Sequence, residues 1–212
     1  MPDAAPDPPR ARTPKGRAPH RRDEKAHLAV LHAADDLLVE RGYGGVTIEG
    51  IASRAGVAKQ TIYRWWSSKD AILLDTLIED ADRQLPVPET GPVLDAVRRY
   101  LRTLARFLTR EPAGKVMLAL IGEAQHDPAA ADALAARFLG PRRERERALL
   151  HDAIVHGELP AGLDVDGVLD ALCGPIVFRA LTGARIPRAF VDRLIADTLA
   201  PHVTQARSGR SV

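Results

Sequence analysis

The chain has 212 residues, of which 45% are hydrophobic and 27% charged, so it can bury a sizeable core and is expected to be globular. Aromatic residues make up only 4%, and the apolar residues are mostly Ala, Leu and Val, which predicts an all-α fold. No apolar run approaches the roughly 20 residues of a membrane span and no signal peptide is visible, so we expect a soluble, cytoplasmic protein with no membrane partner.

Positive charge is concentrated in the N-terminal part of the chain. The net charge of +2 is too small to indicate a nucleic-acid partner by itself. Residues 10–22, however, contain six Lys or Arg and no acid, and residues 41–69 contain five against the single acid Glu49. We interpret residues 1–22 as a disordered basic tail, which is either a solvated terminus or an additional contact to DNA phosphates.

Four helices are predicted in the next sixty residues. Apolar residues spaced by three and four indicate a long first helix that ends at Gly42. Two short helices follow, with Gly56 between them, and Ser67 with Asp70 matches a capping box at the start of the fourth. The predicted helices span residues 23–41, 47–55, 58–66 and 68–85.

Two short helices joined by a glycine turn and supported on each side by another helix are the pattern of a helix-turn-helix. Its predicted core consists of Ile51, Ala52, Val57, Ile62 and Trp66. The second short helix has to enter a major groove about 12 Å wide, so its outer face must carry groups that read bases. Those groups are predicted to be Lys59, Gln60, Thr61 and Arg64. Lys and Arg donate to guanine and Gln pairs with adenine, although Arg64 alone also suits a solvated surface.

This region resembles the TetR-family DNA-binding domain. Residues 47–74, with the sequence TIEGIASRAGVAKQTIYRWWSSKDAILL, match the family in register. Family-typical residues stand at Ala34, Gly42, Tyr43, Ile51, Ala52, Ala55, Gly56, Val57, Tyr63 and Lys69. The resemblance implies that Thr47 caps the second helix and touches a phosphate, that Tyr63 gives its hydroxyl to the DNA backbone, and that Lys69 meets a phosphate. A phosphate at the start of the fourth helix also suits the free N–H groups there.

Two positions depart from the family pattern. Ala58 replaces a common Ser, so the third helix loses its usual side-chain cap. Trp65 replaces a His or Tyr, and we expect it to stack on a sugar or lie against the DNA backbone without a charge. Tyr63 has an alternative role as a packed core residue. The full set of predicted DNA contacts is Thr47, Lys59, Gln60, Thr61, Tyr63, Arg64, Trp65 and Lys69.

Residues 86–204 are predicted to form a second, longer-helix domain, followed by a loose tail at 205–212. Pro92 suits the start of its first helix, and Pro112 ends that helix. Gly140 and Pro141 are expected to bend or break a long helix that starts near Pro128. The predicted helices span about 92–112, 115–125, 128–156, 164–182 and 187–203.

The C-terminal segments also resemble those of TetR regulators, more weakly. The resemblance implies a homodimer through the last two helices, about 165–182 and 187–203, and an unknown small-molecule effector. Side chains that are candidates for the effector pocket, and equally good core residues, are Leu104, Met117, Leu120, Ile121 and Phe138. Pairing also has a physical motive, because two reading helices about 34–36 Å apart bind one face of palindromic operator DNA.

Enzymatic and metal-binding functions find little support. Glu123, His126 and Asp127 are close in sequence but suit a helix end and its surface, and we expect no cofactor and no metal. Cys173, the one cysteine, is interpreted as a small buried residue. The alternating Arg and Glu residues of 142–147 are interpreted as a solvated, self-paired helix face. The resulting hypothesis is a ligand-released repressor; the alternatives are a DNA-binding regulator without a ligand, a DNA-processing enzyme and a helical interaction protein that does not bind DNA.

Overall fold

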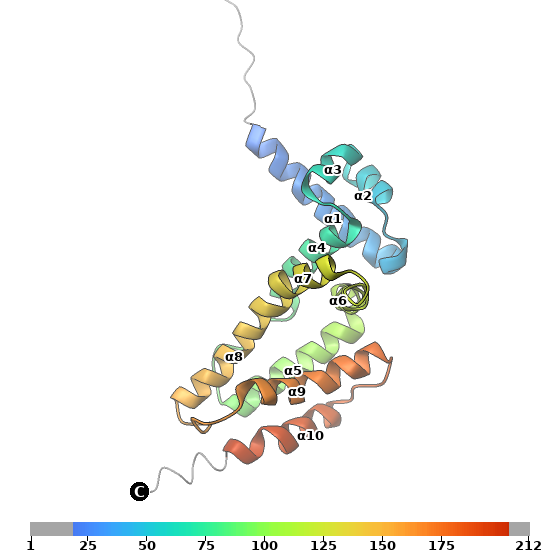
Figure 1. Ribbon diagram of the computed structural model, residues 1–212. Coiled ribbons are helices and arrows are strands. Elements are labelled where there is room, and N and C mark those ends of the chain that lie inside the picture. Colours follow the sequence, from blue (N-terminus) through green and yellow to red (C-terminus); the bar gives the residue numbers. More distant parts are fainter. Residues whose placement is uncertain (1–18, 204–212) are drawn as a thin grey trace, which may run out of the picture.

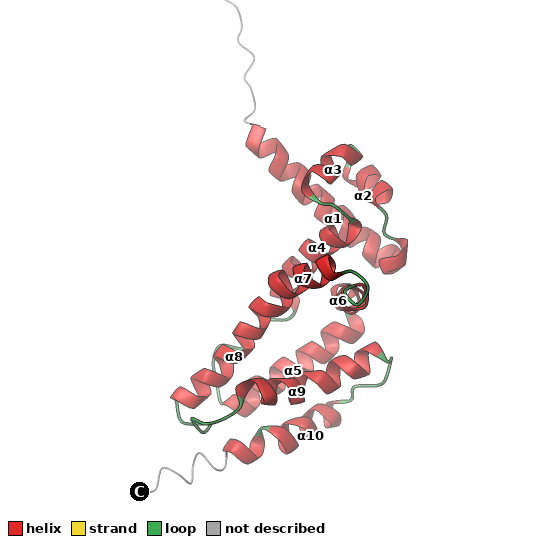
Figure 2. Cartoon of the chain, in the orientation of Figure 1, coloured by secondary structure: helices red, strands yellow, loops and turns green. Residues whose placement is uncertain are grey.

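The computed structural model describes residues 19–203, and the helices in it form two units (Figure 1). Among the described residues no strand occurs, and loops join the helices (Figure 2). The predicted all-α fold is therefore confirmed. None of the described helices is long and apolar enough to span a membrane. Residues 1–18 and 205–212 of the predicted tails lie outside the described residues.

The first unit is built on α1 (Pro19–Gly45), which begins earlier than predicted. Residues 19–22 therefore belong to a helix, and the prediction that they form part of a disordered tail is wrong. Gly42 interrupts α1 with a φ of 69°, a left-handed conformation that glycine adopts without a steric penalty. The helical turn beyond Gly42 changes direction and leads the chain to α2.

The next three helices of this unit are α2 (Ile48–Ala55), α3 (Lys59–Trp65) and α4 (Lys69–Gln84). Helices α2 and α4 pack against α1, and α3 packs against α2. Ser68 caps α4, because its hydroxyl oxygen accepts a hydrogen bond from Ala71 N–H at 3.2 Å. The predicted capping box from Ser67 is thus wrong by one residue. Asp70, its expected partner, instead accepts a hydrogen bond from Tyr43.

The second unit surrounds α5 (Val93–Arg110), whose apolar face is almost fully buried. Helix α5 contacts α6, α8, α9 and α10. Pro112 is the first residue of α6 rather than a spacer before it, as suits a residue without an N–H. The remaining helices are α6 (Pro112–Glu123), α7 (Pro128–Leu134), η1 (Ala135–Leu139), α8 (Gly140–Val155), α9 (Val165–Leu181) and α10 (Arg188–Thr198).

The expected bend or break near Gly140 takes the form of a single wide π-turn, η1, between α7 and α8. Gly140 N–H donates to the carbonyl of Ala135, five residues earlier, so the helix continues through this point. Pro141 has no N–H to donate, and a π-turn just before it absorbs the missing hydrogen bond. Such turns are frequent at functional positions in helices.

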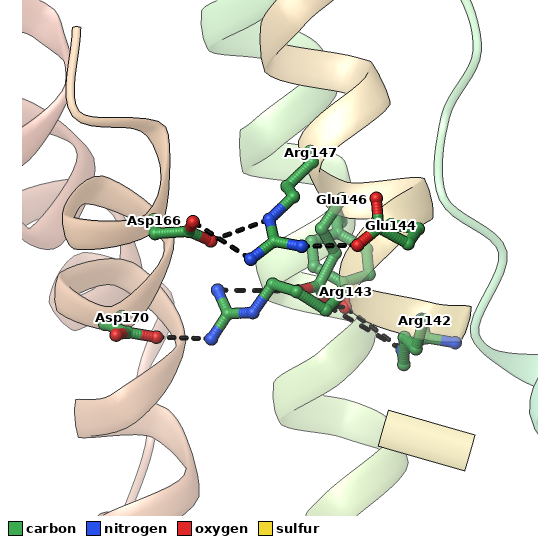
Figure 3. A network of polar contacts seen from close by, with 8 residues as sticks. Arg142, Arg143, Glu144, Glu146, Arg147, Asp166 and Asp170 are labelled. Carbon is green, nitrogen blue, oxygen red and sulfur yellow. Dashed lines mark hydrogen bonds and ion pairs between the residues drawn. The ribbon is translucent and has the colours of Figure 1, made fainter. Parts of the chain in front are cut away.

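The Arg and Glu residues of α8 pair with one another, as predicted, but the row is not wholly solvated. Arg142 and Glu146 are buried, and Arg142 donates to Tyr100 and to the carbonyl of Leu85. Burial raises the pKa of Tyr100 well above its ordinary value. Figure 3 shows the row, in which Arg143 and Arg147 reach across to Asp170 and Asp166 of α9. The row therefore fixes α8 to its neighbours.

Candidate nucleic-acid interface

Helix α3 is held on the first unit by two buried side chains. Ile62 is fully buried and Trp66, at the end of the helix, is 4% exposed. Gly56 turns the chain between α2 and α3 with a φ of 65°, in the left-handed region. Ala58 gives α3 no side-chain cap, as the sequence indicates. A helix of seven residues without a cap owes its stability to this apolar contact.

The outer face of α3 carries the predicted reading groups in exposed positions. Lys59, Gln60 and Arg64 are exposed, and Tyr63 is 55% exposed. The packed-core alternative for Tyr63 is therefore wrong. Thr61 is half-buried on the same helix. The face combines cationic, amide and phenolic donors, the side-chain types that contact base edges and phosphates.

Lys59 is held by an acid that the sequence pattern does not indicate. Its Nζ lies 2.8 Å from Oε1 of Glu49, which is in the first turn of α2. The hydrogen bond from Lys59 lowers the pKa of the Glu49 carboxyl. Both side chains are more than half exposed, so the pair is a weak one that solvent screens. Ten residues separate the partners, and the glycine turn between the two helices brings them together.

Thr47 and Lys69 flank the face from the starts of α2 and α4. The Thr47 hydroxyl oxygen accepts a hydrogen bond from Gly50 N–H at 3.1 Å and so caps α2. Lys69 is the first residue of α4, and its Nζ lies 4.3 Å from the centre of the Tyr43 ring. Tyr43 donates to Asp70 at 2.7 Å, and burial raises the pKa of its phenol. The break at Gly42 thus positions a ring that supports the Lys69 cation.

An aromatic cluster lies behind the end of α3. Trp65 is half-buried and meets Trp66 edge to face, with ring centres 5.5 Å apart. His27 of α1 packs on Trp66 with ring centres 4.6 Å apart. The Arg64 guanidinium lies 5.1 Å from the centre of the Trp65 ring. Trp65 therefore has a packing role in addition to its predicted DNA contact, and sequence spacing gives no sign of His27.

The same cluster connects the two units. The Trp66 indole N–H donates to Asp75 Oδ2 of α4 at 2.7 Å. The other carboxylate oxygen of Asp75 accepts from Arg137, which belongs to the π-turn η1. One carboxylate thus joins the end of α3 to the second unit.

The five predicted effector-pocket residues lie in or against the core of the second unit. Leu104, Met117, Leu120 and Phe138 are buried, and Ile121 is half-buried. They come from α5, α6 and η1, and α5 packs against α6. Among the described residues, no group of three or more His, Cys, Asp or Glu side chains is arranged to hold a metal. Burial raises the pKa of the Cys173 thiol to about 12, which makes it unreactive at neutral pH.

A short helix with exposed polar and cationic residues, mounted on three supporting helices, defines a helix-turn-helix regulator that binds DNA. The family model for "Bacterial regulatory proteins, tetR family" matches residues 30–76, and the model for "Tetracyclin repressor-like, C-terminal domain" matches residues 87–198. The chain belongs to the TetR family of bacterial transcriptional regulators.

Related proteins agree with this assignment. The HTH-type transcriptional regulator YdeS of Bacillus subtilis is 42% identical over 82% of this chain and 88% of its own length. The DNA-binding transcriptional repressor TetR of Mycobacteroides abscessus is 32% identical over 84% of this chain and 94% of its own. The crystal structure of the TetR family transcription regulator SCO0332 superposes with a TM-score of 0.73 and 33% identity, covering 82% of this chain and 96% of that one.

Proposed function

We propose that the protein is a repressor that binds a palindromic operator as a homodimer and is released by a small-molecule effector. The observation that carries the proposal is the outer face of α3, where Lys59, Gln60 and Arg64 are exposed above a buried Ile62. This arrangement suits a helix that enters the major groove. The repressor named as such in Mycobacteroides abscessus, 32% identical to this chain, supports the direction of regulation.

We assign distinct roles to the residues of the interface. Gln60 and Lys59 read base edges, with Gln60 suited to adenine and Lys59 to guanine. Lys59 exchanges its ion pair with Glu49 for the DNA contact, which limits the net gain in binding free energy. The remaining contacts, to phosphates and sugars, come from Thr47, Thr61, Tyr63, Arg64, Trp65 and Lys69. Arg64 is also suited to contact base edges, since guanidinium groups pair bidentately with guanine.

The homodimer forms through α9 and α10 in this proposal. Phe178 and Leu181 of α9 are 67% and 51% exposed, which is unusual for large apolar side chains. Ala171 and Gly174 are also exposed and precede them at helical spacing. These residues form a stripe along α9 that a second copy of the chain would cover, and α10 packs beside α9. Pairing would present two α3 helices to one face of the DNA.

Effector control would act through the second unit. A ligand between α5, α6 and η1, near Met117 and Phe138, would favour one arrangement of the two α3 helices over another. Release requires the ligand to bind the DNA-free arrangement more tightly, as linkage demands. The Trp66–Asp75–Arg137 contact gives such a change a direct route to α3.

Selection of bound duplexes from a randomised DNA pool tests the proposal. We expect a two-fold symmetric sequence whose half-sites lie about 34–36 Å apart on one DNA face. Binding of that duplex should fall steeply with salt, because Lys and Arg contacts release counterions. Enrichment of no sequence, or of a sequence without symmetry bound by one chain, would contradict the proposal.

A further inference from the structure

A cleft rich in arginine lies between α5 and α10, and none of the residues that line it belongs to α3 or to the predicted effector pocket. One hollow of about 400 Å³ is lined by Arg102, Arg106, Arg110 and Arg188. A second hollow, of about 480 Å³, shares Arg110 and Arg188 with it and adds Arg185. The α9–α10 connection that borders the second hollow lies at the end of the bundle nearer α6 (Figure 1).

The charges in this cleft are unbalanced. Among the described residues no acid lines either hollow. Arg102 pairs with Asp192 at 2.8 Å and Arg106 with Glu111 at 2.9 Å, so two of the five cations are neutralised from outside the lining. The side chains of Arg110, Arg185 and Arg188 make no hydrogen bond or ion pair with a described residue. Three exposed guanidinium groups without a partner among the described residues therefore surround one cleft.

The start of α10 adds further donors to the lining of the cleft. Helix α10 starts after Pro187 without a side-chain cap, so its first N–H groups are available to an anion. The apolar residues Ala105, Ile186 and Val191 complete the lining. A cavity of this size with convergent polar groups and an apolar wall has the properties of a small-molecule site.

We propose that this cleft binds a small phosphorylated molecule. A phosphate monoester carries a charge between about −1.5 and −2 at pH 7 in one compact group, which matches several unpaired cations better than a single carboxylate does. Arginine forks bind phosphate oxygens bidentately, and the apolar wall accommodates the rest of the molecule. The site is independent of the DNA interface and of the proposed effector pocket, because it shares no residue with either.

Binding of inorganic pyrophosphate to the full-length protein without DNA tests this proposal. Calorimetry and thermal unfolding would be recorded against sodium chloride and sodium sulfate at equal ionic strength. We expect pyrophosphate to bind and to raise the melting temperature well beyond either salt, since a ligand of the folded state stabilises it. An equal response to all three salts would overturn the proposal.

Substitutions of the cleft arginines test where pyrophosphate binds. Arg110→Ala and Arg188→Gln should each weaken pyrophosphate binding at least about tenfold, the effect of losing one charge-assisted hydrogen bond. Without pyrophosphate, both should melt at the temperature of the unmodified protein, because neither side chain has a hydrogen bond or ion pair with a described residue to lose; a purely structural role would lower the melting temperature. Lys115→Ala is the matched control, since Lys115 is an exposed cation of α6 outside the cleft lining.

Two results would contradict the assignment. If Lys115→Ala weakens pyrophosphate binding as much as Arg110→Ala does, the anion is attracted by general charge and the cleft is not its site. If Arg110→Ala and Arg188→Gln leave pyrophosphate binding unchanged but weaken binding of the selected duplex, the arginines contact DNA phosphates instead.

Discussion

The two units of this regulator use similar mixtures of charged residues for different purposes. In the DNA-binding unit, Lys59 pairs with Glu49 across one turn between adjacent short helices, and both remain exposed. In the second unit, Arg142 is buried and holds α8 against Tyr100 of α5 and the carbonyl of Leu85. An exposed ion pair can be replaced by a contact to DNA at little cost in free energy, whereas a buried charged side chain fixes the packing of helices. The comparison shows that the helices packed beside a charged side chain determine whether it stays exposed for binding or is buried and holds the fold together.

Removal of Arg142 is the strongest test of this difference. Arg142→Ala should lower the free energy of unfolding by about 3–5 kcal/mol, because it removes the buried cation that pairs with Glu146 and donates to Tyr100 and to the carbonyl of Leu85. Arg145→Ala, on the same helix, removes an exposed pair with Asp82 and should cost at most about 1 kcal/mol. Urea unfolding measures both. Equal costs would show that burial does not separate the two kinds of charge.

The α8 charges also mark where prediction from sequence fails. The alternation of Arg and Glu in residues 142–147 is what an exposed, self-paired helix shows, and nothing local distinguishes Arg142 from Arg145. Their difference comes from α5 and the end of α4, which are distant in sequence and accept hydrogen bonds from Arg142 through Tyr100 and the carbonyl of Leu85. By contrast, the turn at Gly56 and the exposed face of α3 follow from spacing within one short segment, so the helix-turn-helix was predictable.

Contacts between helices that are distant in sequence also explain most of the other differences between the sequence prediction and the structure. Ser67 and Ser68 are equivalent as caps in sequence, and the hydrogen bond that Tyr43 of α1 donates to Asp70 removes the capping-box alternative. The pairing of Lys59 with Glu49 and the packing of His27 on Trp66 both depend on contacts between helices. The helical residues 19–22 lie in a basic stretch with a proline and no periodic pattern, so the start of α1 was placed too late.

The apolar stripe on α9 provides the next largest expected effect. Phe178→Asp should raise the dissociation constant of the dimer at least about 30-fold, because it places a charge where a large exposed apolar side chain would be covered. Val155→Asp is the control, since Val155 is 78% exposed at the end of α8, outside α9 and α10. Sedimentation velocity measures the dimer dissociation constant of each variant. A dimer that tolerates Phe178→Asp would place the interface elsewhere.

Lys69 gives a smaller effect within the DNA-binding unit. Lys69→Ala should weaken binding of selected and unrelated duplexes by a similar factor, about tenfold or less, since a phosphate contact carries no sequence information. The slope of log affinity against log salt should fall by about 0.9, the contribution of one phosphate. Fluorescence anisotropy at several salt concentrations provides both numbers. An effect confined to the selected duplex would assign Lys69 to base readout.

The smallest effect concerns a pair of acids between α1 and α4. Burial, followed by the nearby charge of Asp80, raises the pKa of Asp35. A raised pKa in the folded state means that Asp35 stabilises the fold when protonated and that this contribution is lost as pH rises through the folded-state pKa. Asp35→Asn should therefore raise the melting temperature slightly at pH 7, with the gain shrinking as the pH is lowered toward 4. A gain that is independent of pH would exclude the carboxyl charge as its source.

Base preference of the Gln60 variant is the most direct test of the account. The unmodified protein and Gln60→Ala would be compared on all single-base changes of the selected duplex. We expect the variant to lose about 1–3 kcal/mol of discrimination at one symmetry-related pair of positions and to keep its preference elsewhere. An unchanged preference at every position would contradict the placement of α3 in the major groove.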